Sequence, residues 1–526
     1  MKRFLLKSLS LIFLVNLLAC PAPVKQDPYT LNYHIGAEPD TLNRLTSTDA
    51  YSSTINSYIF DSLLERDNKT LDWIPKLAHS WEISEDKLQY TFWLREDVYW
   101  HDGKKFTADD VIYTFEKIQD PKVNTPHTRV YYQDVDRVEK IDDFTVRFTY
   151  KKPYFKALGI LAGIPIVPKH IFETDQDFNN HTAGRKPIGN GPYRFVEWKT
   201  GKHIVLVRNE DYWDTDHLPE IKKIVFKIIA DDTLALKKLK KGELDYAGLT
   251  PIAWEKQTNS EKFNRDFVKH KYYSMVYRYI GWNLRKPFFS DKRVRQALTH
   301  LTNRQGILEK LEFGLGKITT GPLWPLGDFY NHQLKPREFN IKKAIELLEE
   351  AGWVDSNGNG IRDKDGVEFE FTFLIPSGRD FYEKLATILK KDLEKAGISM
   401  KIENMEWSIF VQKLHTREFD AVSLAWSGGG FDEDPYQIWH SSQAESGSNF
   451  IGFKNPEADY LLEVARTTFN KEERVGLYRL FHEIIYEEQP YTFLYTGMSL
   501  VARHRRFHNV HVYKGGLDIR EWTLEE

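Results

Sequence analysis

A single cysteine that directly follows an apolar N-terminal segment constrains this 526-residue chain more than any other feature. Three basic residues precede the apolar run at 9–18, which is too short to span a bilayer but has the length of a secretory signal. Cys20 ends the run and is the only cysteine, so no disulfide within the chain can support the fold. The exported protein therefore has to fold around hydrophobic cores of its own.

The sequence Leu-Leu-Ala-Cys at the end of this run resembles a bacterial lipobox. In that motif a small residue, here Ala19, admits the signal peptidase, and the cysteine sulfur carries a diacylglycerol. We therefore expect a signal peptide at 1–19, a lipid on Cys20 and a lipidated tether at 20–28. This predicts a protein anchored at the periplasmic or cell-surface face of a bacterial membrane.

The composition is that of a folded protein and excludes one class of partner. With 41% hydrophobic and 28% charged residues, the chain can form two or three packed units. A net charge of -3 predicts no basic face large enough to bind a nucleic-acid backbone, so we expect no nucleic-acid partner. The 14% aromatic residues suit a large core as well as ligand pockets, and the core interpretation carries more weight.

Strand and helix patterns interleave from about Tyr29 onward, without a long low-complexity linker or an internal repeat. Alternating apolar residues predict strands, and stripes of apolar residues between capping residues predict helices. The strands are expected at 88–94, 144–148, 369–373 and 398–402, and the helices from Thr107 to Pro121, after Asn340, at 381–395, from Arg293 and at 477–485. This alternation predicts mixed sheets flanked by helices, an α/β fold.

The usual local signatures of enzymes are missing. There is no P-loop, no Gly-x-Gly-x-x-Gly and no Gly-x-Ser-x-Gly in the chain. His482 begins a near miss to the zinc-protease helix, but the second metal-binding position is Tyr486, so we interpret this segment as helix surface. His504, His508 and His511 lie among arginines, which favours a solvated basic turn over a metal site.

One loop resembles a calcium-binding loop. It places Asp355, Asn357, Asn359 and Asp363 at alternate positions, but its twelfth position is Gly366 and not a bidentate glutamate. A turn rich in Asx and Gly residues between a helix and a strand is the alternative, and we favour it. The loop remains a weak calcium candidate.

A pair of adjacent carboxylates raises the alternative that the protein is an enzyme, namely a hydrolase. Glu433 and Asp434 are adjacent, but adjacency does not provide the spacing across a sugar that glycosidases need. We expect no enzyme activity. A secreted hydrolase is kept as the different-class alternative.

Five blocks, in their order along the chain, resemble the family 5 extracellular solute-binding proteins, which include the dipeptide- and oligopeptide-binding receptors of ABC importers. Each block also has a structural reason of its own, such as a turn or a helix cap, so the blocks identify a scaffold and not a ligand. The blocks are Glu38–Asn43, Leu77–Glu82 leading to Trp100–Val111, Gly189–Tyr193, Gly242–Asp245 and Arg293–Leu298.

The resemblance implies a two-lobed, periplasmic-binding-protein-like fold of type II, with an extra α/β subdomain inserted in the first lobe. The expected division is 29–50, 168–280 and 496–526 for the first lobe, 51–167 for the inserted subdomain and 281–495 for the second lobe. Hinges are expected near Ile280 and Tyr495. The implied function is capture of short peptides between closing lobes by a monomeric receptor, without a cofactor, for delivery to ABC transporter permease subunits.

The resemblance also implies candidate residues for the two ends of a peptide. In the peptide receptors an aspartate after a comparable strand end pairs with the ligand's ammonium group, and Asp432 is the matching candidate here. It sits one residue off the dipeptide-receptor pattern relative to Pro435, so Asp434 is the second choice. Arg379 resembles the arginine that meets the ligand's carboxylate and would offer a bidentate fork.

Three further residues complete the candidate ligand site, namely Trp426, Phe431 and Glu38. Trp426 either lines a side-chain pocket or packs the lobe. Aromatic platforms such as this one suit sugars equally well, and the family also includes receptors for nickel chelates. A receptor of the same fold for an oligosaccharide or a nickel chelate is therefore the alternative within the class.

Overall fold

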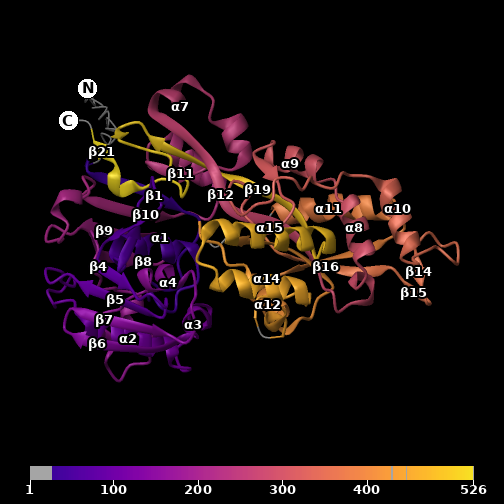
Figure 1. Ribbon diagram of the computed structural model, residues 1–526. Coiled ribbons are helices and arrows are strands. Elements are labelled where there is room, and N and C mark those ends of the chain that lie inside the picture. The colour runs from indigo at the N-terminus through magenta and orange to yellow at the C-terminus, as the bar shows by residue number, and fades with distance from the viewer. Residues whose placement is uncertain (1–26, 379, 428–430, 446, 525–526) are drawn as a thin grey trace, which may run out of the picture.

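The computed structural model describes residues 27–378, 380–427, 431–445 and 447–524. The expected signal peptide, Cys20 and Arg379 lie outside these residues. Figure 1 shows the early part of the chain gathered on one side and the later part on the other, with the last residues returning to the first side. Among the described residues, no helix has both the length and the apolar character needed to cross a membrane. The prediction of an α/β fold is confirmed.

The first lobe is built on one end of an 11-stranded sheet. In this part of the sheet β1 pairs in parallel with β10 and β11, and antiparallel pairing adds β9 and β8. The strands are β1 (Thr30–Ile35), β8 (Tyr193–Lys199), β9 (His203–Arg208), β10 (Lys223–Ile228) and β11 (Tyr246–Gly248). The helices are α1 (Ala50–Ile59), α6 (Asp232–Lys240) and α7 (Glu261–Asp266).

A separate four-stranded antiparallel sheet belongs to the same side of the molecule. Its order is β4 (Ala78–Ile83), β5 (Gln89–Leu94), β7 (Thr145–Tyr150) and β6 (Val135–Asp142). Helix α2 (Ala108–Gln119) begins after Thr107, as predicted, and Asp110 accepts a hydrogen bond from the Thr107 N–H at 3.1 Å. The other elements here are β2 (Leu64–Arg66), β3 (Trp73–Pro75), α3 (Pro126–Tyr132), α4 (Ala157–Ala162) and α5 (Lys169–Phe172).

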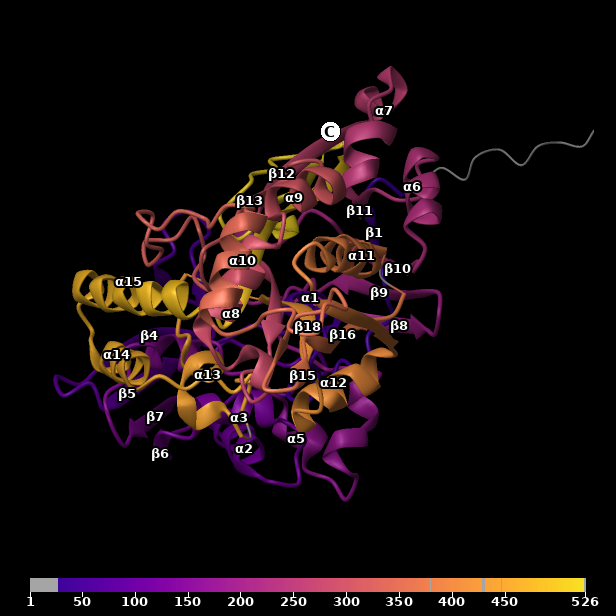
Figure 2. The same cartoon turned by 90° about the vertical axis from the view of Figure 1, so that its right-hand side faces the viewer.

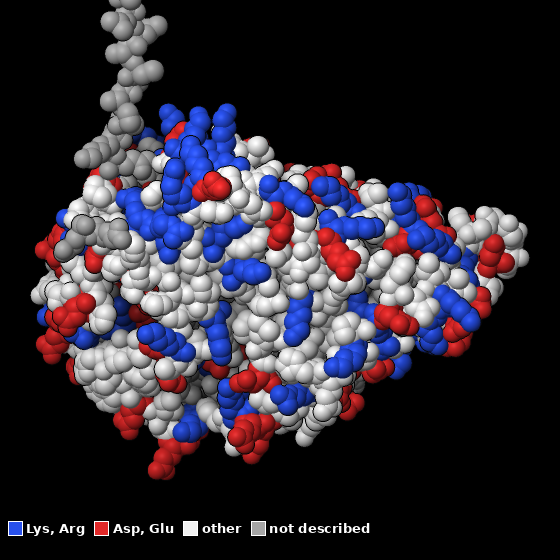
Figure 3. Space-filling view, turned by 90° about the horizontal axis from the view of Figure 1, so that it is seen from above, with Lys and Arg blue, Asp and Glu red and all other residues white. Residues whose placement is uncertain are grey.

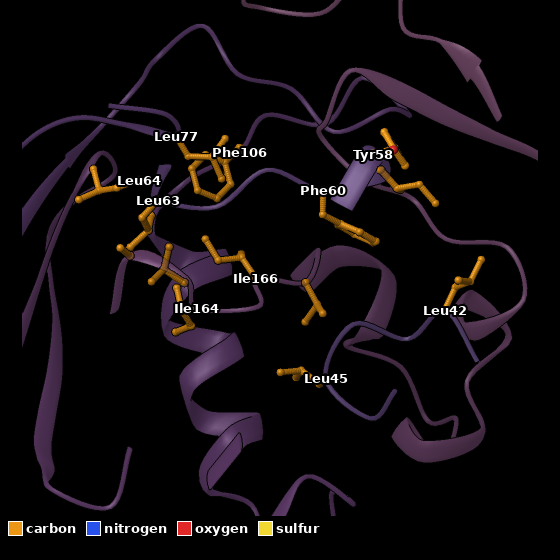
Figure 4. Packing of buried hydrophobic residues seen from close by; sticks show 14 of the residues in the cluster. Leu42, Leu45, Tyr58, Phe60, Leu63, Leu64, Leu77, Phe106, Ile164 and Ile166 are labelled. Carbon is orange, nitrogen blue, oxygen red and sulfur yellow. The ribbon is translucent and has the colours of Figure 1, made fainter. Parts of the chain in front are cut away.

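One hydrophobic core joins this four-stranded unit to the first lobe. Figure 4 shows Phe60 with Leu42, from the segment before α1, on one side and Ile164 and Ile166, from the segment after α4, on the other, and Leu45 belongs to the same core cluster. All five side chains are at most 6% exposed. The expected boundaries at 50/51 and 167/168 therefore cross a continuous core, and they stay predictions.

The Gly-Asn-Gly-Pro motif has a packing role beyond the turn that its sequence suggests. A Cβ atom on Gly189 would lie 2.0 Å from the carbonyl oxygen of Ile59, and one on Gly191 would lie 2.8 Å from its carbonyl carbon. Asn190 Oδ1 accepts a hydrogen bond from the N–H of Asp61 at 2.9 Å. The motif therefore lets the chain before β8 press directly against the end of α1.

Two long strands connect the lobes, namely β12 (Phe267–Trp282) and β19 (Tyr491–His504). They pair antiparallel along most of their length and belong to the sheet of both lobes. The register shifts between Tyr273 and Tyr277, so the ladder is irregular midway along β12. Ile280 and Tyr495 lie inside the paired strands, and their assignment as hinges stays a prediction.

The second lobe contains the other end of the same sheet, in the order β12, β18, β16 and β17. The strands are β13 (Gly316–Ile318), β16 (Glu370–Pro376), β17 (Ser399–Met405) and β18 (Ala421–Ser427), with a small hairpin of β14 (Asp363–Lys364) and β15 (Val367–Glu368). The helices are α8 (Lys292–His300), α9 (Arg304–Glu312), α10 (Ile341–Glu350), α11 (Asp380–Glu394), α12 (Trp407–Thr416), α13 (Tyr436–Trp439), α14 (Pro456–Thr467) and α15 (Lys471–Glu488). Figure 2 shows α14 and α15 on one side of this lobe and α11 and α12 on the other.

Most of the predicted elements of the second lobe are confirmed. Asn340 caps α10, accepting a hydrogen bond from the Lys343 N–H at 3.0 Å, and the predicted helices and strands around it appear within a few residues of the expected bounds. The chain ends with β20 (Phe507–His508) and β21 (Thr523–Leu524) back on the first lobe.

The interpretation of His482 as helix surface is wrong. Its side chain is fully buried, and burial lowers its pKa to about 4. The ring is hydrogen-bonded to Thr320 Oγ1 at 3.1 Å and to the N–H of Asn331 at 3.2 Å. Helix α15 therefore turns this histidine into the core, where a polar loop satisfies both ring nitrogens.

Candidate functional site

Charged and aromatic side chains from both lobes meet at residues 431–437, the next described residues after β18. Asp432 forms an ion pair with Arg66 of the first lobe, and the two side chains are 34% and 30% exposed. The β2–β3 hairpin positions Arg66, because its guanidinium lies over the ring of Trp73, 3.9 Å from the centroid. Nη1 of Arg66 also donates to the carbonyl of Leu71 at 2.5 Å. The predicted ammonium anchor therefore lies at the junction of the lobes and has a cation opposite it.

Asp434 has a different environment from Asp432. Its side chain is 3% exposed. Its Oδ2 accepts hydrogen bonds from Arg466 Nε at 3.0 Å and from the Tyr154 hydroxyl at 2.7 Å. The main-chain N–H of Phe155 donates to the carbonyl of Arg466 at 2.9 Å, which strengthens the same contact between the lobes. Asp434 is thus fully engaged within the protein, which makes it a poorer ligand candidate than Asp432.

Between these two aspartates, Glu433 points into the protein. It is 6% exposed, and its Oε1 accepts a hydrogen bond from the main-chain N–H of Trp324 at 2.7 Å. Burial raises the pKa of Glu433 to about 7. Burial also lowers the pKa of Lys156, and the charges of Asp434, Asp432 and Glu433 oppose this shift. The junction therefore holds one carboxyl group that ionises near neutral pH.

The aromatic candidates Trp426 and Phe431 precede this acidic segment in the chain and contact other rings of the second lobe. Trp426 is stacked against Phe450, with ring centroids 5.7 Å apart, and its Nε1 donates to the Tyr491 hydroxyl at 3.3 Å. Phe431 meets Trp324 edge to face at 6.3 Å. The Trp324 indole in turn donates to the carbonyl of Ser274 at 3.2 Å, within the irregular part of β12. These rings pack the second lobe, and Trp324 adjoins the acidic segment through its N–H, which donates to Glu433.

A polar cavity of about 350 Å³ lies on the first-lobe side of Arg66. Glu65 lines it while the next residue of β2, Arg66, reaches Asp432, since neighbouring side chains of a strand point to opposite faces. Arg520 links Glu65 at 2.6 Å to Asp518 at 2.7 Å on the returning C-terminal segment. The cavity is lined by Arg44, Ser57, Tyr58, Phe60, Asp61, Ser62, Glu65, Asn68, Lys76, Tyr513, Gly515, Gly516, Leu517, Asp518 and Arg520.

The structure does not bring Glu38 together with the other candidates. Its carboxylate accepts hydrogen bonds from Trp198 Nε1 at 2.7 Å and from the N–H of Gly201 at 2.9 Å. Arg185 lies 3.7 Å away. These partners all belong to the first lobe, where Glu38 holds the β8–β9 hairpin in place. Its role as a ligand residue stays a prediction.

In the loop that resembles a calcium site, the side-chain oxygens bind the backbone. Asp355 accepts from the N–H groups of Gly358 and Gly360 at 2.8 and 3.0 Å, and Asn357 and Asn359 each accept from an N–H two residues later. Asp363 is buried and accepts from Ser356. Within the described residues, no group of three or more His, Cys, Asp or Glu is placed to hold a metal ion. This geometry is that of the Asx- and Gly-rich turn.

Sequence reasoning missed the first-lobe partners of the acidic segment. Arg66 and Asp432 are 366 positions apart, and Tyr154 and Asp434 are 280 apart. Neither Arg66 nor Tyr154 belongs to a motif or has a distinctive spacing. Only the chain topology brings them to residues 431–437, so the sequence contains no local signal for these pairs.

Comparison with known proteins identifies the family to which this chain belongs. Residues 72–448 match the model of the bacterial extracellular solute-binding proteins, family 5. The chain is 34% identical over 506 residues to the oligopeptide-binding protein AppA of Bacillus subtilis, covering 93% of this chain and 90% of that protein. The chain therefore belongs to the family 5 extracellular solute-binding proteins, which confirms the resemblance.

Solved structures confirm the two-lobed fold. The structure of AppA from Bacillus subtilis in complex with a nonapeptide matches with a TM-score of 0.83 and 33% identity, covering 94% of this chain and 99% of that one. NikZ from Campylobacter jejuni in complex with Ni(L-His) matches with a TM-score of 0.81 and 29% identity, over 94% and 100%. DppA from Helicobacter pylori in complex with the peptide STSA matches with a TM-score of 0.82 and 26% identity, over 94% and 98%.

Proposed function

We propose that this protein captures short peptides between its two lobes and delivers them to an ABC importer. The observation that carries the proposal is Asp432, a carboxylate at the junction of the lobes that is one-third exposed and faces the other lobe. Relatives that bind peptides, AppA and DppA, support this choice of ligand. The nickel-chelate receptor NikZ shares the fold, so the ligand has to be decided by the site.

The Arg66–Asp432 pair suggests how a peptide would be accommodated. Each partner is partly exposed, and an exposed ion pair is worth little, about 0 to 1 kcal/mol, so a ligand can replace it at low cost. The ammonium group of a peptide would take the place of the guanidinium beside Asp432. A ligand that touches both lobes then favours the closed arrangement over the open one.

The proposal also includes the membrane anchor, the transporter partners, the bounds of the lobes and the residue for the ligand's carboxylate. Cys20 would carry the lipid that anchors the receptor at the outer face of a membrane, and the protein would act as a monomer with the permease subunits as its partners. The lobes would divide at residues 280/281 and 495/496. Arg379, although outside the described residues, stays the candidate for the ligand's carboxylate.

Native mass spectrometry of protein purified without added ligand tests the choice of ligand. A heterogeneous set of bound masses that fit peptides is the expected result. A single mass that carries a nickel isotope pattern, or a ladder of hexose masses, would replace the peptide by one of the alternatives. Addition of peptides should raise the melting temperature, because a ligand that binds only the folded state stabilises it.

The same samples test the hydrolase alternative. Peptides and oligosaccharides incubated with the protein should be recovered intact. Turnover of a bound ligand that is abolished by Glu433→Gln or Asp432→Asn would replace the receptor by an enzyme.

A further inference from the structure

A basic surface lies on the first lobe at the place where the described chain begins. We define this basic face by Lys237, Lys240, Lys241, Lys256, Lys262 and Arg505, all of which have exposed side chains. Figure 3 shows Lys and Arg side chains gathered at this edge of the first lobe. Within the described residues, none of these six cations forms an ion pair with a carboxylate. Their charge is therefore available to a partner.

Helices α6 and α7 bring several lysines of the basic face close together. Helix α6 presents Lys237 on the same face as the 43% exposed Leu234, and the C-cap residue Lys241 continues this face four residues later. Lys240 and Lys241 line a hollow together with Lys262 of α7 and His504. A cation at the C-terminal end of a helix interacts favourably with the helix dipole, but that effect is limited to the last turn and does not explain Lys262.

Three acidic residues beside the basic face pair with other cations, while Asp232, Glu255 and Glu261 are in no ion pair with a described residue and offset part of its charge. Glu243 pairs with Lys238 at 2.6 Å, and Asp266 pairs with Arg265 at 2.9 Å. The buried Asp245 pairs with Arg506 at 3.0 Å. The basic face is thus an excess of positive charge on a chain whose formal net charge is -3.

The first described residues are tied to the same surface. Arg506 donates to the carbonyl of Pro28 at 2.5 Å and to that of Thr30 at 2.6 Å. The residue before it, Arg505, belongs to the basic face, and its N–H donates to the carbonyl of Asp266 at the end of α7. Cys20 precedes Pro28 by only eight positions in the sequence. A lipid on Cys20 would therefore bring this face, and not the opposite side of the molecule, to the membrane.

We infer that the basic face is a docking surface for anionic phospholipids, which orients the anchored receptor on its membrane. This inference rests on the lipid anchor of the proposed function, but not on the nature of the ligand. Each Lys or Arg near an anionic surface contributes about 1 kcal/mol, which corresponds to about fivefold in binding. The attraction acts over about 10 Å at 0.1 M salt, so it operates only when the face lies against the headgroups.

The first experiment compares lysine accessibility on two membranes. The full chain is purified from membranes and reconstituted into vesicles of phosphatidylcholine alone or with phosphatidylglycerol, and its lysines are acetylated and located by mass spectrometry. Lys240, Lys241 and Lys262 should be labelled several-fold more slowly on the anionic vesicles, and high salt should restore the rate. The reference lysines Lys104 and Lys342, which are exposed elsewhere on the molecule, should be labelled equally on both.

The second experiment uses two variants with the same change in charge. Lys240→Gln, Lys241→Gln and Lys262→Gln together should reduce co-sedimentation with anionic vesicles at least about tenfold. The control changes Lys104, Lys342 and Lys391 to Gln, three exposed lysines that, like the others, form no ion pair with the described carboxylates, and it should bind like the original protein. Peptide affinity should be unchanged in both variants.

Three results would overturn the inference. Equal losses in the two variants would assign the effect to net charge, and equal protection on vesicles without anionic lipid would assign it to the anchor alone. Protection that appears only after transporter subunits are added to the vesicles would assign the face to a protein partner. A chain that carries no lipid would refute the anchor, but its co-sedimentation with anionic vesicles still tests the basic face.

Discussion

The Tyr154 hydroxyl donates a hydrogen bond of 2.7 Å to Asp434 Oδ2, so the first lobe supplies a partner to a buried carboxylate of the second. A second tyrosine crosses the same junction, because the Tyr131 hydroxyl donates to Gln437 Oε1 at 2.6 Å. The two bonds differ in charge, since only the first has an ionised acceptor. The two bonds can therefore be compared to measure how much each contributes to the contact between the lobes.

Tyr154→Phe should weaken the junction more than Tyr131→Phe. Hydrogen bonds to charged groups are worth about 1.5 to 3 kcal/mol and neutral ones about 0.5 to 1.5 kcal/mol. Each variant is unfolded in denaturant, and small-angle scattering reports how far the lobes are apart. Tyr154→Phe should give the larger loss of unfolding free energy and the more open average shape. Equal losses would mean that Arg466 alone satisfies Asp434.

Asp432→Asn should remove the anchor for the ligand's ammonium group while keeping the shape of the side chain. When the lobes enclose the peptide, its ammonium group and Asp432 would form a buried charge pair, and truncating one partner of such a pair costs about 2 to 5 kcal/mol. An N-acetylated peptide, which has no ammonium group, should lose much less. Calorimetric titration with both forms of one peptide measures the difference. Asp328→Asn, which changes an exposed aspartate paired with Lys471, is the control. Equal losses for the two peptides would exclude Asp432 as the ammonium anchor.

Glu433 should make folding less favourable as the pH rises from about 4.5 to about 7. Its pKa is raised in the folded protein, so the folded state holds the proton in this window while the unfolded state has released it. The contribution is about 3 kcal/mol, fully present below pH 4.5 and lost as the pH passes 7. Glu433→Gln keeps an acceptor for the Trp324 N–H and should remove this dependence.

Denaturant unfolding at several pH values checks the assignment of Glu433. Glu472→Gln makes the same chemical change at an exposed position of α15 and should leave the pH dependence unaltered. His482 acts in the opposite direction, because its lowered pKa makes folding less favourable as the pH falls from 6.5 to about 4. The Glu433→Gln protein should therefore lose more stability on acidification than the original. An unchanged profile would mean that the pKa of Glu433 is the same in the folded and the unfolded protein.

Gly321→Ala should destabilise the second lobe through the buried His482. A Cβ at this position would lie 2.3 Å from Cδ2 and Nε2 of the ring, and hydrogen bonds to Thr320 and Asn331 prevent the ring from moving away. Such overpacking costs about 1 to 3 kcal/mol. Gly476→Ala, where a Cβ has nothing within 4 Å, should be neutral or slightly stabilising.

A double variant separates this contact from a general effect on the lobe. Gly321→Ala combined with His482→Ala should lose less than the sum of the single changes, by about 0.5 to 3 kcal/mol. Additive losses, measured in the same unfolding experiment, would show that the ring and the new methyl group do not meet.

Cys20→Ala should abolish fatty-acid labelling and the processing step that follows it. The expected lipobox has no other cysteine to substitute for Cys20. Metabolic labelling with a fatty acid, followed by electrophoresis, measures both effects. Labelling that persists in the variant would contradict the lipobox assignment.

Local patterns predicted the elements but not their long-range partners. The caps at Thr107 and Asn340 and the alternation in β5 involve residues within a few positions of one another, so their signals are readable in the sequence. In α15 the predicted helix at 477–485 is present, but not all of its apolar residues face the core. Leu480 is 50% exposed while His482 is buried, because a polar partner at Thr320 makes burial of a histidine possible.

Of the candidate site, the residues of the second lobe could be predicted from the sequence, but their partners in the first lobe could not. The acidic segment around Asp432 was predicted as a ligand site from its place after a strand and its resemblance to the family, and the structure places this segment between the lobes. Arg66 and Tyr154 were not found, because a single arginine or tyrosine far away in the chain has no mark that distinguishes it from others of its kind. Their role follows only from the sheet and hairpin geometry that places them opposite residues 431–437.

The pairing of Gly281 with Tyr491 has a consequence for the modularity of the molecule. The crossings proposed between the lobes, at 280/281 and 495/496, lie within a few residues of this pair, and the two residues are neighbours across a strand ladder. The second lobe is therefore an insertion in the first lobe, and the two ends of this insertion are adjacent in space. A short turn that joins Gly281 to Tyr491 would close the two strands into a hairpin. A different second lobe whose two ends are equally close together could therefore be inserted into the same first lobe.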